Sequence, residues 1–191
     1  SEAVGYDVML TKMVQMTPEP HRMSIATSKD NEGWTLLHRA SLAGNVESLK
    51  VTRPLYTEAS YLETVAVREN FSGATVLHLA VRSGNPEMIA YIVASLSVSQ
   101  LCRLVNMQDF SGKTALHRIA ECSVTGTTMK LIFSLLTETQ RLQLFNMRDA
   151  RGRTLLHCAH RTPQTIKDIL NALPKSQRMR VVCVQDRDGW T

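Results

Sequence analysis

A six-residue pattern, G-x-T-x-L-H, recurs along the chain at nearly constant spacing, and this periodicity constrains the fold more than any other feature. The four complete copies begin at Gly33, Gly73, Gly112 and Gly152, which lie 40, 39 and 40 residues apart. A partial copy, GWT, begins at Gly189, 37 residues after Gly152. Such regular self-similarity predicts a stack of similar units, each of which buries its apolar face against its neighbours.

Each residue type in the pattern has a physical role at its position. Glycine can adopt the positive φ that a tight turn needs. Threonine suits the N-cap of a helix, where its hydroxyl accepts a hydrogen bond from the amide three residues later, which here belongs to the histidine. Leucine points into the stack, and the small residues that follow let neighbouring helices approach closely: Ala40, Ala80, Ala120 and Ala159. Each copy therefore predicts a projecting turn followed by a helix.

A second helix is predicted after the first in the earlier units. The pairs Gly44-Asn45 and Gly84-Asn85 provide a turn between the two helices. Apolar residues then recur at helical spacing, at Met88, Ile89, Ile92, Val93 and Leu96. Pro54 falls where the second helix of the first unit should continue, so we expect that helix to end early or bend.

The recurring pattern resembles the ankyrin repeat, in which an Asp or Asn stands three residues before the glycine. The corresponding residues here are Asp30, Asn70, Asp109, Asp149 and Asp186. The proline that usually follows the threonine is absent, and the repeats are longer than the usual length of about 33 residues. The resemblance covers roughly residues 18–191. It implies an all-α fold, a right-handed ankyrin-repeat solenoid with projecting turns.

The surplus residues also recur, which indicates an additional element in each repeat. Ser97-x-x-Gln100 and Thr137-x-x-Gln140 are capping boxes that mark helix starts. We therefore predict an extra short helix before each projecting turn, with Leu104, Leu144 and Val181 buried.

These patterns divide the chain into six predicted segments. Residues 1–29 are expected to be an N-terminal cap or part of a preceding repeat, whose second helix would carry Val4, Val8, Met13 and Val14. The other segments are ankyrin repeats at 30–69, 70–108, 109–148 and 149–185, and the start of a truncated fifth repeat at 186–191.

Catalysis and metal or cofactor binding are not expected from the motifs. The four His of the repeats, His38, His78, His117 and His157, lie one per repeat and are expected to bond backbone across the repeat interface rather than converge on a metal ion. None of the four cysteines forms a C-x-x-C pair, and Cys122 and Cys158 are expected to be buried thiols. No nucleophile motif or phosphate-binding loop is present. We predict that the chain is not an enzyme and uses no cofactor.

Composition restricts the partners and the location. The formal net charge is +5, but no run of five basic residues occurs, so a nucleic-acid-binding tail is not indicated. No apolar stretch approaches the roughly 18 residues of a membrane helix, and no signal peptide is evident. Low cysteine usage favours a reducing compartment. We predict an intracellular location, cytoplasmic or nuclear.

The predicted function is that of a protein–protein interaction scaffold. In ankyrin proteins the turn tips and first helices usually hold the partner on a concave face. Carried onto this sequence, and with aromatic and arginine side chains dominating binding energy, the predicted partner-binding residues are Trp34, Phe71, Arg82, Phe110, Lys113, Arg151, Arg153 and Arg161. The basic ones would suit an acidic or phosphorylated segment. Several alternatives stay open. The Phe residues would instead pack against the neighbouring turn while Trp34 covers the cap, and the basic residues would form a solvated face. The chain would otherwise be a targeting module of a larger enzyme or bacterial effector, or a weak electrostatic binder of nucleic acid or anionic lipid.

Overall fold

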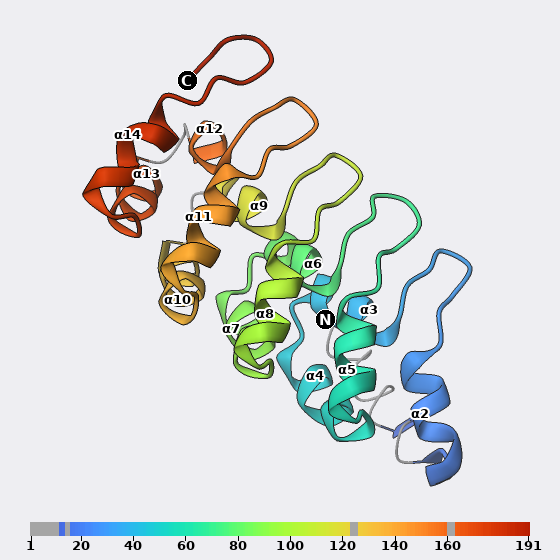
Figure 1. Ribbon diagram of the computed structural model, residues 1–191. Helices are drawn as coiled ribbons and strands as arrows, with labels where there is room; N and C mark the ends of the chain where they lie inside the picture. The colour runs from blue at the N-terminus through green and yellow to red at the C-terminus, as the bar shows by residue number, and fades with distance from the viewer. Residues whose placement is uncertain (1–11, 14–15, 123–125, 160–162) are drawn as a thin grey trace. The chain divides into compact units, whose positions relative to one another are not determined.

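The computed structural model describes residues 12–13, 16–122, 126–159 and 163–191. Within these ranges the regular structure is helical, apart from one isolated antiparallel bridge between Gln108 and Thr114. The chain divides into two compact units, residues 1–92 and 93–191. The predicted all-α class is therefore confirmed for the described residues (Figure 1).

In the first unit, the helices that follow the first two projecting turns, α3 (Leu36–Ala43) and α6 (Val76–Ser83), pack against each other. Leu37 and Ala40 on α3 and Val76, Leu77 and Ala80 on α6 are all buried, and α3 packs directly against α6. The helical elements of this unit are α2 (Glu19–Thr27), α3 (Leu36–Ala43), α4 (Val46–Thr52), the 3-10 turn η1 (Arg53–Leu55), α5 (Glu58–Val65), α6 (Val76–Ser83) and most of α7 (Pro86–Ala94).

The second unit has the same order of elements. The first helices α9 and α12 pack together, and the second helices α10 and α13 do the same. Leu116, Ile132, Leu155 and Ile169 lie in the core of this unit. Its helices are α8 (Val98–Val105), α9 (Ala115–Glu121), α10 (Gly126–Leu135), α11 (Glu138–Asn146), α12 (Leu155–Cys158), α13 (Pro163–Asn171) and α14 (Lys175–Val182).

The predicted extra helix is present before every projecting turn, as α2, α5, α8, α11 and α14. Reciprocal capping boxes at Ser97 and Thr137 begin α8 and α11, as their spacing predicted. Leu104, Leu144 and Val181 are at most 2% exposed, so the apolar face of the extra helices forms part of the core. The added length of the repeat is thus a packed helix rather than a longer loop.

The turn between first and second helices also follows the prediction where it is described. Gly44 and Gly84 are left-handed C-caps, and the Asn45 side chain accepts a hydrogen bond from the Ser48 amide at the start of α4. Helix α4 ends at Thr52, and Pro54 lies in η1. Proline removes one backbone donor and crowds the preceding turn, so the α-helical hydrogen bonding stops there.

Some expectations fall outside the described residues or are wrong. Val4, Val8 and Val14 lie outside them, so the predicted helix near the N-terminus is not described. Met13 is 48% exposed. Cys122 was expected to be buried but is exposed, because α9 ends at Glu121 and Cys122 already has an extended backbone. Cys158 is buried as expected, and its burial raises the pKa of the thiol to about 11.

Candidate functional site: the projecting turns

Five turns project from the helices of the described chain. Figure 1 shows the first four as long loops between the extra helix and the following first helix, and the fifth as a loop after α14. We name them the first turn (residues 30–34), second turn (69–74), third turn (109–113), fourth turn (149–153) and fifth turn (186–190). The first two belong to the unit 1–92, and the other three belong to the unit 93–191.

A carboxylate at the start of each turn holds its backbone. In the third turn, Asp109 Oδ1 accepts hydrogen bonds from the amides of Ser111 (2.9 Å) and Lys113 (3.0 Å). The Asp109 amide donates to the Lys113 carbonyl at 2.8 Å, which closes the loop. Gly112 has φ +73°, a region that L side chains rarely adopt. The same bonding recurs at Asp30, Asp149 and Asp186.

The second turn differs, and here the predicted leading residue Asn70 is wrong. Glu69 takes its place, and its carboxylate accepts hydrogen bonds from the amides of Phe71, Ser72 and Ala74. This turn has one more residue than the first, since Glu69 bonds backbone to backbone with Ala74 whereas Asp30 bonds with Trp34. The longer glutamate side chain spans the additional residue. Constant spacing back from the glycine could not reveal this insertion.

Neighbouring turns within a unit are joined by backbone hydrogen bonds. The Asn70 amide donates to the Glu32 carbonyl at 2.9 Å. The amide of Ala150 donates to the Ser111 carbonyl at 2.9 Å, and that of Arg187 to the Arg151 carbonyl at 3.1 Å. Bonds within and between turns therefore fix the backbone that carries the exposed tips.

The repeated histidines cap helices, as the sequence indicated. His38 Nδ1 lies 2.8 Å from the Thr35 hydroxyl, and the same reciprocal box begins α6, α9 and α12. The expected bond across the repeat interface is present for His157, whose Nε2 lies 2.8 Å from the Trp190 carbonyl. The Nε2 of His38 lies 3.1 Å from the Val67 carbonyl, which belongs to the same predicted repeat as His38. Within the described chain, the buried Nε2 of His117 has no partner at hydrogen-bond distance. Burial lowers the pKa of both His38 and His117.

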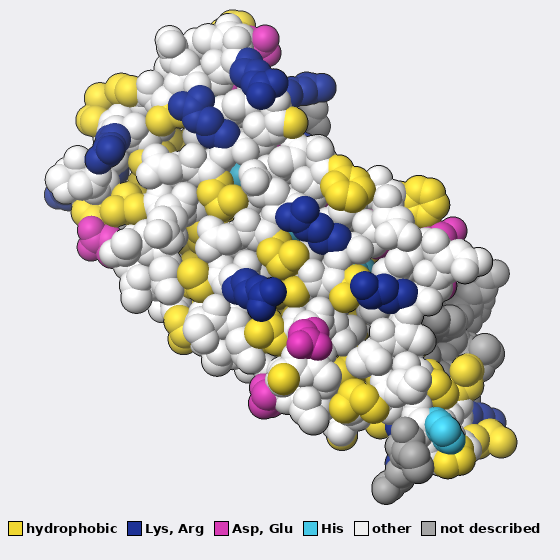
Figure 2. All heavy atoms as spheres, turned by 45° about the vertical axis from the view of Figure 1, so that its right-hand side comes forward, with side chains coloured by type: hydrophobic (Ala, Val, Ile, Leu, Met, Phe, Trp, Pro, Cys, Tyr) yellow, Lys and Arg dark blue, Asp and Glu magenta, His cyan; other side chains and the backbone are white. Residues whose placement is uncertain are grey.

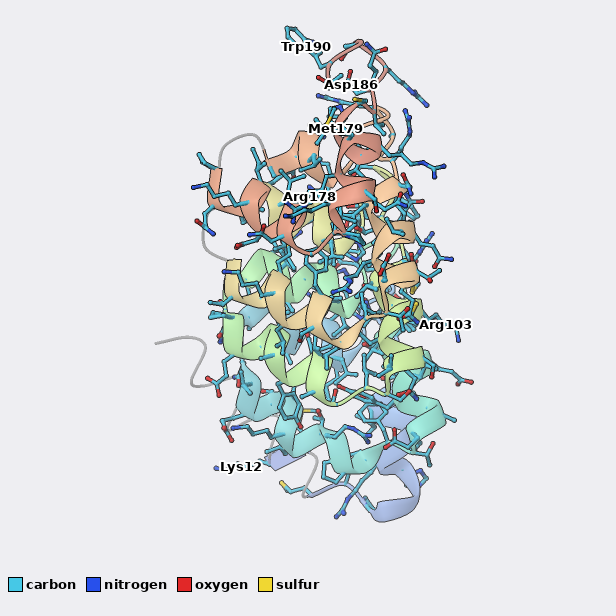
Figure 3. All side chains as sticks on the ribbon, turned by 60° about the vertical axis from the view of Figure 1, so that its left-hand side comes forward. Lys12, Arg103, Arg178, Met179, Asp186 and Trp190 are labelled. Carbon is cyan, nitrogen blue, oxygen red and sulfur yellow. The ribbon has the colours of Figure 1, made fainter. Side chains whose placement is uncertain are left out.

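The aromatic residues of the predicted site have different environments. Phe71 is 73% exposed at the second turn and Phe110 is 62% exposed at the third. Trp34 is only half-buried at the first turn, with the Arg39 guanidinium 4.5 Å above the centre of its ring. Trp190, which is not among the predicted binding residues, is 73% exposed and extends away from the helices in Figure 3.

Two of the predicted basic residues, Lys113 and Arg153, are paired with acidic neighbours. Lys113 pairs with Glu121, and Arg153 pairs with Asp149 at 2.7 Å and lies 3.6 Å from Glu121. Arg118 also bonds Asp109 at 2.6 Å. These carboxylates on α9 and in the turns were not anticipated as partners, and only the contact of Arg153 with Glu121 joins two predicted repeats.

The other basic positions are more open. Arg82 on α6 and Arg151 in the fourth turn are exposed, and Arg161 lies outside the described residues. On the face drawn in Figure 2, hydrophobic side chains lie between the Lys and Arg side chains within each unit.

The third and fourth turns enclose a surface hollow of about 330 Å³. Burial of Asp109 and Asp149 opposes their ionisation. Hydrogen bonds from Ser111 and Arg118 to Asp109, and from Arg153 to Asp149, outweigh it and hold both pKa values below the ordinary value. The hollow therefore contains ion pairs of both aspartates with arginines, beside the exposed Arg151. It is lined by Ser111, Lys113, Arg118, Glu121, Asp149, Ala150, Arg151 and Arg153.

Comparison with family models gives a match to one part of the chain. A family model described as an ankyrin repeat matches residues 72–99, which run from the second turn through α6 and α7. No curated protein matches the chain. Among the described residues, no group of His, Cys, Asp or Glu could hold a metal ion, and no helix has the length and apolarity needed to cross a membrane.

Proposed function

We propose that this chain, in which residues 72–99 match an ankyrin-repeat family model, is a protein-interaction module without catalytic activity of its own, and that it holds its partner at the tips of the projecting turns. The observation that carries this proposal is the exposure of Phe71 and Phe110 on backbone that is fixed by hydrogen bonds. A large apolar ring held out in water has no role in the core, whereas aromatic side chains supply much of the binding energy at protein interfaces.

The rigidity of the turns favours binding. The Glu69 carboxylate accepts three backbone amides of the second turn. In the third turn, Asp109 and the bond from Ala150 to Ser111 restrain the loop on both sides. A tip that is already ordered loses little conformational freedom when a partner covers it, so more of the contact energy remains as affinity.

The exposed Arg151 provides a positive charge that can select partners with an acidic group. Arg151 is exposed and lines the hollow between the third and fourth turns. An acidic or phosphorylated side chain of the partner would pair with it through a charge-assisted hydrogen bond. Lys113 and Arg153 are already paired with Glu121 and Asp149, so they contribute less to binding of an anion than the sequence suggested. Extensive phosphate binding, as nucleic acid requires, is disfavoured for the same reason.

Affinity capture with matched variants tests the proposal. The bait is the chain itself, beside Phe71→Ser, Phe110→Ser and Val98→Ser, each washed at low and moderate salt. Val98 is the control, because it is 48% exposed but lies on α8 rather than on a turn. We expect a protein partner that survives moderate salt and is retained by Val98→Ser but lost by at least one Phe variant.

Two outcomes would count against this function. Retention of nucleic acid or lipid alone, removed by moderate salt, would favour the electrostatic alternative. A protein partner held equally by the wild type and both Phe variants would move the binding surface away from the tips.

A further inference from the structure

A second surface hollow lies in the unit 93–191, away from the projecting turns. It has a volume of about 410 Å³ and lies among α10, α11 and α13. Helices α10 and α13 pack side by side there (Figure 1). Its lining is mixed, with Phe133 and Ala172 beside the polar side chains of Lys130, Ser134, Arg141, Gln164, Asp168 and Asn171.

The hollow contains a buried carboxylate that is only half satisfied. The Asp168 side chain is 3% exposed. Its Oδ1 accepts hydrogen bonds from Gln164 Nε2 at 2.9 Å and pairs with Lys130 Nζ at 3.1 Å. Its Oδ2 is buried and has no hydrogen-bond partner in the described chain. A buried carboxylate oxygen without a donor costs free energy, so this position favours an incoming N–H or O–H group.

A donor without an acceptor lies in the same lining. Arg141 Nε is buried and, among the described residues, has no partner, although one terminal nitrogen of its guanidinium donates to the Phe133 carbonyl at 3.4 Å. Lys130 is 60% exposed at the rim and keeps donors free beyond its bond to Asp168, because an ammonium group has three. The hollow thus has two cationic hydrogen-bond donors, Arg141 and Lys130, that can bind an anion. It also has one acceptor, Asp168 Oδ2, that can bind an N–H or O–H group.

We infer that this hollow binds the carboxyl-terminal residue of a partner polypeptide. A chain terminus carries a carboxylate and an amide N–H on the same Cα, so a single residue satisfies both kinds of orphan group. The carboxylate would bond Arg141 Nε and Lys130, and the amide would donate to Asp168 Oδ2. In an Asp or Glu residue within a chain, flexible methylenes separate the side-chain carboxylate from the backbone amide. Ordering both groups in the hollow would therefore cost more conformational entropy.

The size of the hollow agrees with this ligand. A volume of about 410 Å³ is at the small end for ligand pockets, which suits one or two residues better than a long segment. The site uses none of the tip residues, so it stands or falls separately from the proposed function.

Nuclear magnetic resonance titration of the isotope-labelled chain tests the inference with defined probes. The probes are N-acetylated Gly-Ala, Gly-Leu, Gly-Phe and Gly-Ser with free carboxylates, the same four as C-terminal amides, and acetate. We expect at least one free-acid dipeptide to shift the Arg141 Nε–H resonance saturably, with its amide at least about tenfold weaker. Lys130→Met should weaken that binding, and Lys167→Met, an exposed lysine on α13 outside the lining, should leave it unchanged.

Each other result overturns the inference. If none of the four acids saturates, Asp168 Oδ2 is bonded by solvent and the hollow is a simple crevice. If acid and amide bind equally, the carboxylate is not recognised. Acetate binding as tight as the best dipeptide identifies a small-anion site, and equal loss in both lysine variants identifies a non-specific charge effect.

Discussion

The first and fourth turns share one backbone design but place it in different surroundings. Asp30 and Asp149 each accept the amides two and four residues later and pair with an arginine at 2.7 Å. The Asp30 side chain is 40% exposed and its partner Arg39 is 44% exposed, whereas Asp149 is 1% exposed and Arg153 is 21% exposed. Water screens the first pair, so the same bonds should matter much more to stability in the fourth turn.

The largest expected effect is therefore that of Asp149→Ala. Removing this carboxylate leaves the amides of Arg151 and Arg153 without their acceptor and the Arg153 guanidinium without its closest partner. We expect a loss of about 3 kcal/mol in the free energy of unfolding, typical of a broken buried pair. Asp30→Ala should cost clearly less. Denaturant unfolding of both variants measures the difference, and equal losses would show that burial does not distinguish the two turns.

Two glycines with the same backbone conformation provide a second comparison. Gly112 and Gly84 have φ +73° and +72°, but a Cβ on Gly112 would lie 2.6 Å from the Ala150 amide nitrogen, whereas one on Gly84 would meet nothing within 4 Å. Gly84→Ala should cost about 1 kcal/mol, the strain of a left-handed alanine alone. Gly112→Ala should cost at least twice as much and lower the melting temperature further. Similar melting temperatures would mean that the third and fourth turns can separate without penalty.

The side-chain length at the second turn provides a subtler test. Glu69→Asp keeps the charge but shortens the side chain that spans the extra residue and reaches the amides of Phe71, Ser72 and Ala74. We expect a loss of about 1 kcal/mol, close to one or two weakened hydrogen bonds. Amide hydrogen exchange at Ser72 and Ala74 should become faster, with little change in the third turn. Unchanged exchange would show that glutamate is not specifically required there.

The pH dependence of the free energy of unfolding should separate the contribution of the histidines to stability from that of the aspartates. Burial lowers the pKa of His38 and His117, so the unfolded chain binds their protons more tightly than the folded chain. Their contribution is complete above about pH 6.5 and is lost as the pH falls below that value. The free energy of unfolding should therefore decrease between pH 7 and 5, and less so in His117→Gln. An identical decrease in that variant would show that His117 does not contribute to the pH dependence of stability.

The aspartates affect the free energy of unfolding at lower pH than the histidines do. Because the pKa values of Asp109 and Asp149 are held below the ordinary value in the folded chain, their contribution is complete above about pH 4 and is lost below it. The stability difference between wild type and Asp149→Asn should therefore narrow as the pH is lowered from 4 to 2. A difference that stays constant over that range would mean that Asp149 acts only through its shape.

The sequence predicted what depends on neighbours along the chain. The positive φ of Gly112, the Thr114–His117 capping box and the helix after Ser97 all follow from residues within a few positions of one another. It missed what depends on contacts between repeats. Examples are the pairing of Glu121 with Arg153 and the orphan oxygen of Asp168. The use of Glu69 in place of Asn70 is local to its turn, but counting a constant distance back from the glycine conceals it. No local pattern encodes which side chains of successive repeats meet.

The most direct test of tip binding is an equilibrium titration of the captured protein partner against wild type, Phe110→Ala and Val98→Ala by calorimetry. An aromatic residue central to an interface should weaken binding at least about tenfold when it is truncated, or about 1.4 kcal/mol. We predict that loss for Phe110→Ala and an unchanged affinity for Val98→Ala. Equal affinities for all three proteins would contradict the role assigned to the projecting turns.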